Sequence, residues 1–218
     1  EGGRVQRFRE GYTRLPPMLT LEAIFHQDEA RAIGLAREQG WLMAWEVRRQ
    51  GVHLSFAPVL DIERDISRVI GDRAFGVAAD LVADFGAAVC RGLLAGGVLP
   101  VIKHLPGHGR AGVDSHQALP LVEAPRELLE ETDFAPFRAL AGAPLGMTAH
   151  VVYTALDPEQ PATTSRLVID QVIRGSIGFQ GLLFSDDLSM SALAGGLGER
   201  AAAALAAAEV PGPVVLEL

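Results

Sequence analysis

The first residues whose types suggest chemistry are Asp114 and His116, two positions apart in a glycine-containing segment. A carboxylate beside a histidine orients the imidazole ring and favours its charged form. The pair therefore suggests a dyad in which His116 gives and takes protons while Asp114 is its partner. The spacing alone does not distinguish such a dyad from a solvent-facing histidine on a turn.

A second candidate lies in the segment 184–190, Phe-Ser-Asp-Asp-Leu-Ser-Met, where two acids follow an apolar run. Side chains alternate along a strand, so Asp186 should face away from Ser185. A carboxylate at a strand end can attack an electrophilic carbon or bind a cation, whereas Asp187 or Ser189 can be the N-cap of a helical turn over 190–193. We assign the chemistry to Asp186 and the cap to Asp187.

Groups that could hold a ligand stand elsewhere in the chain. Lys103 and His104 end an apolar run, while Arg7 and Arg73 fall in predicted loops. Cations beside a sugar or a carboxylate donate strong hydrogen bonds. For any single one of these basic residues, a solvated surface position is the alternative interpretation.

His104 and His108 have the spacing of two metal ligands on one helical turn. Pro106-Gly107 lies between them and should break a helix, so the shared face is lost. The chain has no His-Glu-x-x-His motif, no cysteine cluster and no phosphate-binding glycine pattern, and we predict neither a metal nor a cofactor. We expect instead that Pro106–Gly112 is a hinge and that residues 105–118 are the most mobile part of the site.

Apolar runs alternate with helical patterns along the chain. Strands are predicted over 52–61, 97–103, 145–150, 181–186 and 214–218, and helices near 27–50, 77–95, 125–141, 166–176 and 198–209. This alternation indicates βαβ units and a parallel sheet. Asp61, Lys103-His104, His150 and Asp186 each fall at the carboxyl end of a predicted strand, which is the rim where (β/α) barrels build active sites.

Composition narrows the class of protein. The chain has 218 residues, 49% hydrophobic and 21% charged, as expected for one globular domain. A net charge of -8 argues against a nucleic-acid partner. No apolar run approaches the roughly 18 residues of a membrane helix, and no export leader is recognised, so we expect a cytoplasmic protein. Cys90, the single cysteine, excludes an internal disulfide and lies in an apolar stretch that predicts a buried thiol.

The segment 103–109, Lys-His-Leu-Pro-Gly-His-Gly, followed by Asp-Ser-His at 114–116, closely resembles the signature of bacterial β-N-acetylhexosaminidases of glycoside hydrolase family three. The segments 1–9, 56–61 and 184–190 match the same family in the same order. Together these motifs extend the resemblance from residue 1 to about residue 208.

The resemblance implies a (β/α)8 TIM barrel, and residues 1–218 would be a single catalytic barrel domain that is truncated at both ends. Members of the family remove terminal N-acetylglucosamine with retention of configuration, and the bacterial cytoplasmic ones act on muropeptide fragments in cell-wall recycling. The family's customary aspartate, two residues before the Glu-Gly-Gly run, falls outside this chain. The resemblance further implies a sugar as the partner, with no membrane or nucleic-acid contact, and we expect a monomer.

The resemblance also assigns roles to individual residues. Asp186 would be the nucleophile that forms a glycosyl-enzyme intermediate. His116 would be the acid and base, with Asp114 beside it. The residues implied to hold the sugar are Arg7, Arg73, Lys103 and His104.

Three alternatives remain open at this stage. One is a family-three β-glucosidase, and another is a glycoside phosphorylase, because a histidine acid repels an attacking phosphate less than a carboxylate would. The third is a sugar-binding barrel without activity. The intact set of Asp186, Asp114 and His116 favours an enzyme.

Overall fold

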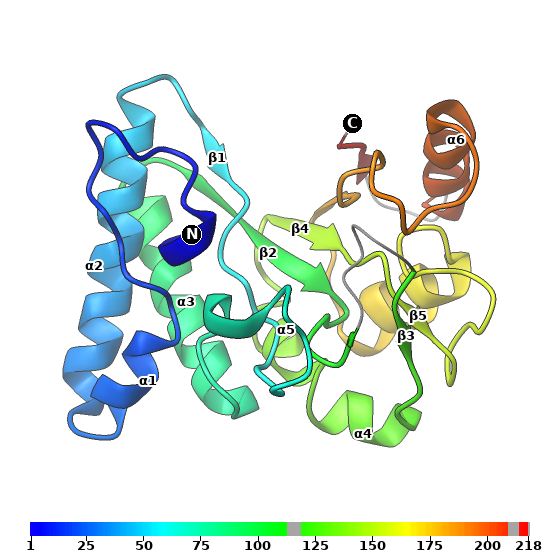
Figure 1. The fold of residues 1–218 in the computed structure, drawn as a ribbon, viewed down its shortest axis with the longest axis horizontal. Helices are drawn as coiled ribbons and strands as arrows, with labels where there is room; N and C mark the ends of the chain where they lie inside the picture. The colour runs from blue at the N-terminus through cyan, green and yellow to red at the C-terminus, as the bar shows by residue number, and fades with distance from the viewer. Residues whose placement is uncertain (113–118, 209–213, 218) are drawn as a thin grey trace.

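The computed structural model describes residues 1–112, 119–208 and 214–217 (Figure 1). Its main sheet is parallel and has the strand order β1-β2-β4-β6-β7. These strands are β1 (Leu54–Ser55), β2 (Leu99–Leu105), β4 (Leu145–Thr148), β6 (Leu182–Phe184) and β7 (Val214–Val215). Because spatial order follows chain order, the sheet winds in one direction, as successive strands of a TIM barrel do. The predicted TIM-barrel-like fold is confirmed.

The long helices cover the ends of this arrangement. Figure 1 shows α2 (Glu29–Arg48) beside α3 (Ala79–Ala95) at one end of the molecule and α6 (Leu197–Ala207) near the other, with β2 and β4 between them. Close packing of α2 on α3 depends on glycine, since a Cβ at Gly92 would lie 2.1 Å from the carbonyl oxygen of Arg37.

Two predicted helices differ in detail from those observed. The helix expected over 125–141 is divided into α4 (Arg126–Glu131) and α5 (Ala135–Ala139). Pro136 stands at the start of α5, where a missing N–H costs nothing, but it would break a helix that continued through it. The helix expected near 166–176 is a π-helix, η3 (Val168–Ser176).

Several short elements have no sequence signal in the patterns above. They are η1 (Gly3–Val5), α1 (Thr20–Phe25), η2 (Gly71–Arg73), β3 (Leu121–Val122) and β5 (Val152–Tyr153). Strands β3 and β5 pair in parallel as a separate two-stranded sheet. Of these elements, η2 matters most for function because it carries Arg73.

The core between sheet and helices is apolar and includes fully buried phenylalanines, among them Phe75, Phe85 and Phe137. Cys90 lies in this core as predicted, and burial raises the pKa of its thiol to about 12. This thiol is therefore inert as a nucleophile at neutral pH. None of the described helices is long and apolar enough to cross a membrane.

Candidate active site

A cavity of about 550 Å³ lies at the carboxyl ends of the strands. Five of the predicted site residues line it, namely Arg7, Arg73, Lys103, His104 and Asp186. The other two, Asp114 and His116, lie outside the described residues. This position at the strand ends is where a barrel places its catalytic side chains.

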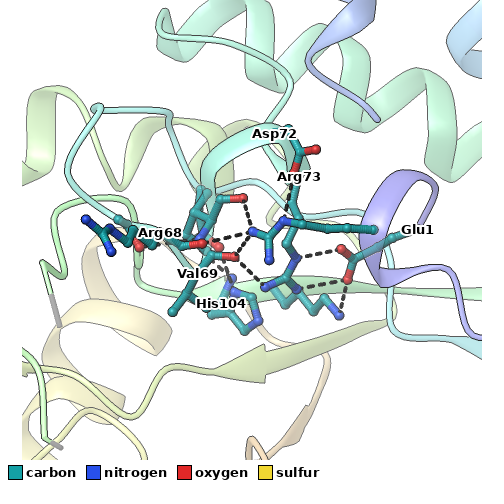
Figure 2. A network of polar contacts seen from close by, with 11 residues as sticks. Glu1, Arg68, Val69, Asp72, Arg73 and His104 are labelled. Carbon is teal, nitrogen blue, oxygen red and sulfur yellow. Dashed lines mark hydrogen bonds and ion pairs between the residues drawn. The ribbon is translucent and has the colours of Figure 1, made fainter. Parts of the chain in front are cut away.

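Glu1 is an anion on the wall of this cavity. Its two carboxylate oxygens accept hydrogen bonds from Nε and Nη2 of Arg73 at 2.8 and 3.0 Å, a bidentate pair (Figure 2). Lys103 places its Nζ 2.6 Å from Oε1 of the same carboxylate. Burial acts to raise the pKa of Glu1, but Lys103 and Arg73 together hold it well below its ordinary value. The three side chains therefore form one buried group with a net positive charge.

The turn that presents Arg73 is fastened to the N-terminal segment. Arg4 donates from Nε to Asp72 at 3.0 Å and from Nη2 to the carbonyl oxygen of Val69 at 2.8 Å (Figure 2). Arg73 itself donates from Nη1 to the same carbonyl at 3.2 Å. These bonds place η2 against the segment that carries Glu1, which fixes the direction of the Arg73 guanidinium.

His104 is oriented by the buried carboxylate of Asp61, which is only 1% exposed. Oδ2 of Asp61 lies 2.6 Å from Nδ1 of His104, and Oδ1 accepts the backbone N–H of His108 at 2.7 Å. Burial acts to raise the pKa of Asp61, but the His104 imidazole and the His108 amide hold it below its ordinary value. Burial, with His104 beside it, lowers the pKa of His108 to about 4, so that ring is neutral at physiological pH.

The first part of the predicted Pro106–Gly112 hinge, as far as Gly109, is packed in the protein interior. Residues 105–109 are buried, and a Cβ at Gly109 would lie 2.1 Å from the carbonyl oxygen of Ile62. The hydroxyl of Tyr153 donates to the carbonyl oxygen of Gly107. The glycines here permit close packing rather than motion, so this part of the segment is an anchored stem.

Asp186 lies just past the end of β6 and is oriented by the residue that follows it. The backbone N–H of Asp187 donates to Oδ1 of Asp186 at 2.9 Å. Burial acts to raise the pKa of Asp186, but His104, His150, this N–H and Lys103 lower it below its ordinary value. The side chain is therefore ionised at neutral pH, which is the state that a carboxylate nucleophile requires.

His150 supports the segment that carries Asp186. Its side chain is fully buried, with Nε2 3.0 Å from the carbonyl oxygen of Asp187 and Nδ1 2.7 Å from the Thr163 hydroxyl. Burial lowers the pKa of His150, so the ring is neutral. It then donates from Nε2 to the Asp187 carbonyl and accepts at Nδ1 from Thr163.

The helix cap assigned to Asp187 is wrong, although the residue does close a turn. Its Oδ1 accepts the backbone N–H of Ser189 at 2.8 Å, two residues on. The chain runs through turns after this point, and the next helix begins at Leu197. Asp187 therefore shapes the bend behind Asp186 instead of starting a helix.

The model of the "Glycosyl hydrolase family 3 N terminal domain" matches residues 1–209. The chain belongs to glycoside hydrolase family 3. The bacterial β-N-acetylhexosaminidase resemblance drawn from the motifs is thereby supported at the level of the family.

Individual members of family 3 are also similar to this chain. A beta-hexosaminidase of Alkalilimnicola ehrlichii is 50% identical over 95% of this chain and 60% of that protein. One of Thiobacillus denitrificans is 47% identical over 94% of the chain and 58% of that protein. The crystal structure of NagZ from Neisseria gonorrhoeae with N-trifluoroacetyl-D-glucosamine is 41% identical, with a TM-score of 0.89 over 99% of this chain and 62% of that one. The chain therefore spans about 60% of the length of these relatives.

Four residues of this family 3 chain that line the cavity, or hold residues that line it, have no role predicted from the sequence. Asp61 and His150 were noted only as strand-end residues, and Glu1 only as part of a motif. Glu217 was missed altogether. It lines the cavity, and burial together with Asp186 and Asp187 raises the pKa of its carboxyl group. Its position just after β7 is a signal that the strand-end rule alone could have supplied.

Metal ligation is absent from the part of the family 3 domain that the structure describes. Among residues 1–112, 119–208 and 214–217, no three His, Cys, Asp or Glu side chains are grouped to hold a metal ion. The cationic side chains around the cavity instead suit a ligand rich in hydroxyl or carboxylate oxygens.

Proposed function

We propose that the protein is a retaining β-N-acetylhexosaminidase that removes terminal N-acetylglucosamine from muropeptide fragments. The observation that carries this proposal is the state of Asp186. It is an ionised, partly buried carboxylate just past a strand end on the cavity wall, with its direction set by the Asp187 N–H. The beta-hexosaminidase relatives support the choice of N-acetylglucosamine as the sugar.

The reaction proceeds in two displacements. Asp186 attacks the anomeric carbon, the bond from that carbon to the leaving oxygen breaks, and His116 gives its proton to that oxygen. Water then attacks the anomeric carbon of the glycosyl-enzyme, His116 takes a proton from the water, and the Asp186 carboxylate is released. Two inversions at one carbon give net retention, and the two side chains complete both steps without a cofactor.

Asp114 is the proposed partner of His116. A carboxylate beside the ring favours the imidazolium form that the first step needs. Both residues lie outside the described part of the structure. Their roles rest on their place in the motif, directly after the anchored stem.

The donors around the cavity are the proposed sugar contacts. Arg73, Lys103 and His104 lie at the buried end of the cavity, and Arg7 stands on its exposed N-terminal wall. Glu1 holds Arg73 and Lys103 in place, so their remaining N–H groups are already directed when a sugar arrives.

We further propose that residues 1–218 belong to a single catalytic barrel domain that acts as a cytoplasmic monomer. The family match over residues 1–209 supports the single domain. The lone buried thiol of Cys90 suits a reducing compartment. Neither nucleic acid nor membrane is a proposed partner, in keeping with the net charge of -8.

The test uses the full-length protein with 4-nitrophenyl N-acetyl-β-glucosaminide and with an N-acetylglucosamine-terminated muropeptide. The proposal expects both to be cleaved, with β-configured N-acetylglucosamine as the first product by NMR. Cleavage of the matching β-glucoside in preference would instead indicate the β-glucosidase. Formation of the sugar 1-phosphate when phosphate is added would indicate a phosphorylase, and no turnover at all would indicate a binding protein.

A further inference from the structure

Asp61 has a set of contacts that the proposed mechanism does not use. It lies past β1 at the cavity end of the sheet and is 1% exposed, with no direct place in the cavity lining. Oδ1 accepts the backbone N–H of His108 at 2.7 Å and that of His104 at 3.3 Å, and Oδ2 lies 2.6 Å from Nδ1 of His104. A buried carboxylate is costly unless several donors satisfy it, and here three donors surround one group.

These contacts decide which nitrogen of His104 carries a proton. Asp61 is ionised, because its pKa lies below the ordinary value. An ionised carboxylate only accepts hydrogen bonds, so Nδ1 of His104 must be the donor of the 2.6 Å contact. Nε2 is then the ring nitrogen left for a ligand, and His104 lines the cavity.

The other oxygen of Asp61 is bound to the stem. The His108 amide that it accepts belongs to the buried run 105–109, which leads toward Asp114 and His116 in the chain. The Asp61 carboxylate thus links the His104 ring on the cavity wall to the backbone of residues 105–109. That segment continues in the chain to the proposed acid and base, His116.

We propose that Asp61 is a positioning residue that fixes the tautomer of His104 for sugar binding and fastens the stem of the acid–base segment. The role of Asp61 in turnover rests on the proposed function, whereas the tautomer of His104 does not. Asp61 touches neither substrate nor reacting atoms, and it acts through His104 and His108.

The decisive variant is Asp61→Asn in the full-length protein. The new side-chain oxygen keeps the two backbone N–H groups satisfied, which leaves the amide NH₂ facing Nδ1 of His104. Nδ1 must then accept, so in the variant Nδ1 carries no proton and the ring proton lies on Nε2. Nitrogen-15 NMR of the imidazole reports this directly: we expect a proton on Nδ1 in the wild type and on Nε2 in Asp61→Asn. The same tautomer in both proteins would overturn the proposal.

Kinetics then separate the two parts of the role. Asp61→Asn should weaken binding of N-acetylglucosamine about tenfold, since one hydrogen bond to the sugar is lost, while kcat falls less. Asp61→Ala loses the stem contact as well and should lower kcat further. Equal kcat and KM effects in the two variants would contradict the separate role of the stem contact.

A matched control is Asp157→Asn. The carboxylate of Asp157 also accepts three hydrogen bonds, from the N–H groups of Glu159 and Gln160 and from the Ser165 hydroxyl, but it does not line the cavity. Asp157→Asn should leave the His104 tautomer and the sugar affinity unchanged, even if the variant protein is less stable than the wild type. If the wild type cleaves no N-acetylglucosaminide, the proposed function fails, yet the tautomer measurement still decides the role of Asp61.

Discussion

The cavity has a buried wall at the end of β2 and an exposed wall formed by the N-terminal segment. Lys103 and His104 are 7% and 5% exposed, and each is tied to a buried carboxylate. In the N-terminal segment Arg7 is exposed, and Phe8, 46% exposed, packs on Tyr12 with ring centroids 5.2 Å apart. Under the proposed function the buried wall holds the reacting sugar in one orientation, and the exposed wall tolerates different groups beyond it.

The largest expected effect is at the buried wall, in Asp186→Asn. The amide cannot form the glycosyl-enzyme, so kcat should fall at least about a thousandfold, while the fold is kept. Turnover of the nitrophenyl substrate measures this, with circular dichroism as the control for folding. A variant that kept the wild-type rate would remove Asp186 from the mechanism.

Replacement of one arginine on each wall compares the two directly. Arg73→Lys loses the bidentate pair with Glu1, and kcat/KM should fall roughly 10- to 100-fold. Arg7→Lys keeps the charge at an exposed position, and the fall should be no more than about threefold. Equal losses from both substitutions would show that the walls do not differ in the proposed way.

Gly109→Ala tests whether the stem is packed rather than mobile. The added Cβ would lie 2.1 Å from the Ile62 carbonyl oxygen, so the backbone must shift, at a cost of about 1–3 kcal/mol in unfolding free energy. At Gly112 the nearest atom to an added Cβ is Cγ2 of Ile66 at 3.3 Å, and Gly112→Ala should cost less. Urea unfolding gives both free energies. If Gly109→Ala left the unfolding free energy unchanged, the interpretation of this segment as a hinge would be favoured instead.

The smallest effect is expected from Glu217→Gln. Asp186 raises the pKa of Glu217, because both are acids near one cavity. The pKa of Asp186 itself lies below its ordinary value, so Asp186 ionises at a lower pH than Glu217 does. Glu217 is therefore neutral while Asp186 titrates, and Glu217→Gln should move the acid limb of the kcat/KM profile by less than about half a pH unit. A shift of about one unit in either direction would contradict this reasoning.

The exposed and buried walls also differ in what the sequence could predict. The alternation of apolar runs and helical patterns predicts the parallel sheet, because it is local in the chain. The position of Lys103, His104 and Asp186 at strand ends is also a local feature, and it predicts that they lie at the active-site edge. The Glu1–Arg73 pair joins residues 72 positions apart, and no local pattern reports such a contact. Asp61 was placed at the correct edge, but its partners became visible only with the backbone of the stem in place.

The errors have equally specific causes. Pro136 breaks the helix expected over 125–141, because a proline inside a helix lacks the N–H and clashes with the preceding turn. Gly107 and Gly109 were interpreted as sources of motion, although a glycine also occurs where another chain segment must approach closely. Which of the two applies depends on neighbours such as Ile62 that lie far along the chain.

The central claim, that Asp186 is the nucleophile, is tested most directly by trapping the intermediate. A fluorinated N-acetylglucosaminide with a good leaving group slows the second displacement, and the full-length protein is then digested and analysed by mass spectrometry. We expect one covalent sugar per protein molecule, attached to the peptide that contains Asp186 and absent from Asp186→Asn. A sugar attached to another carboxylate, such as Glu217, would contradict it.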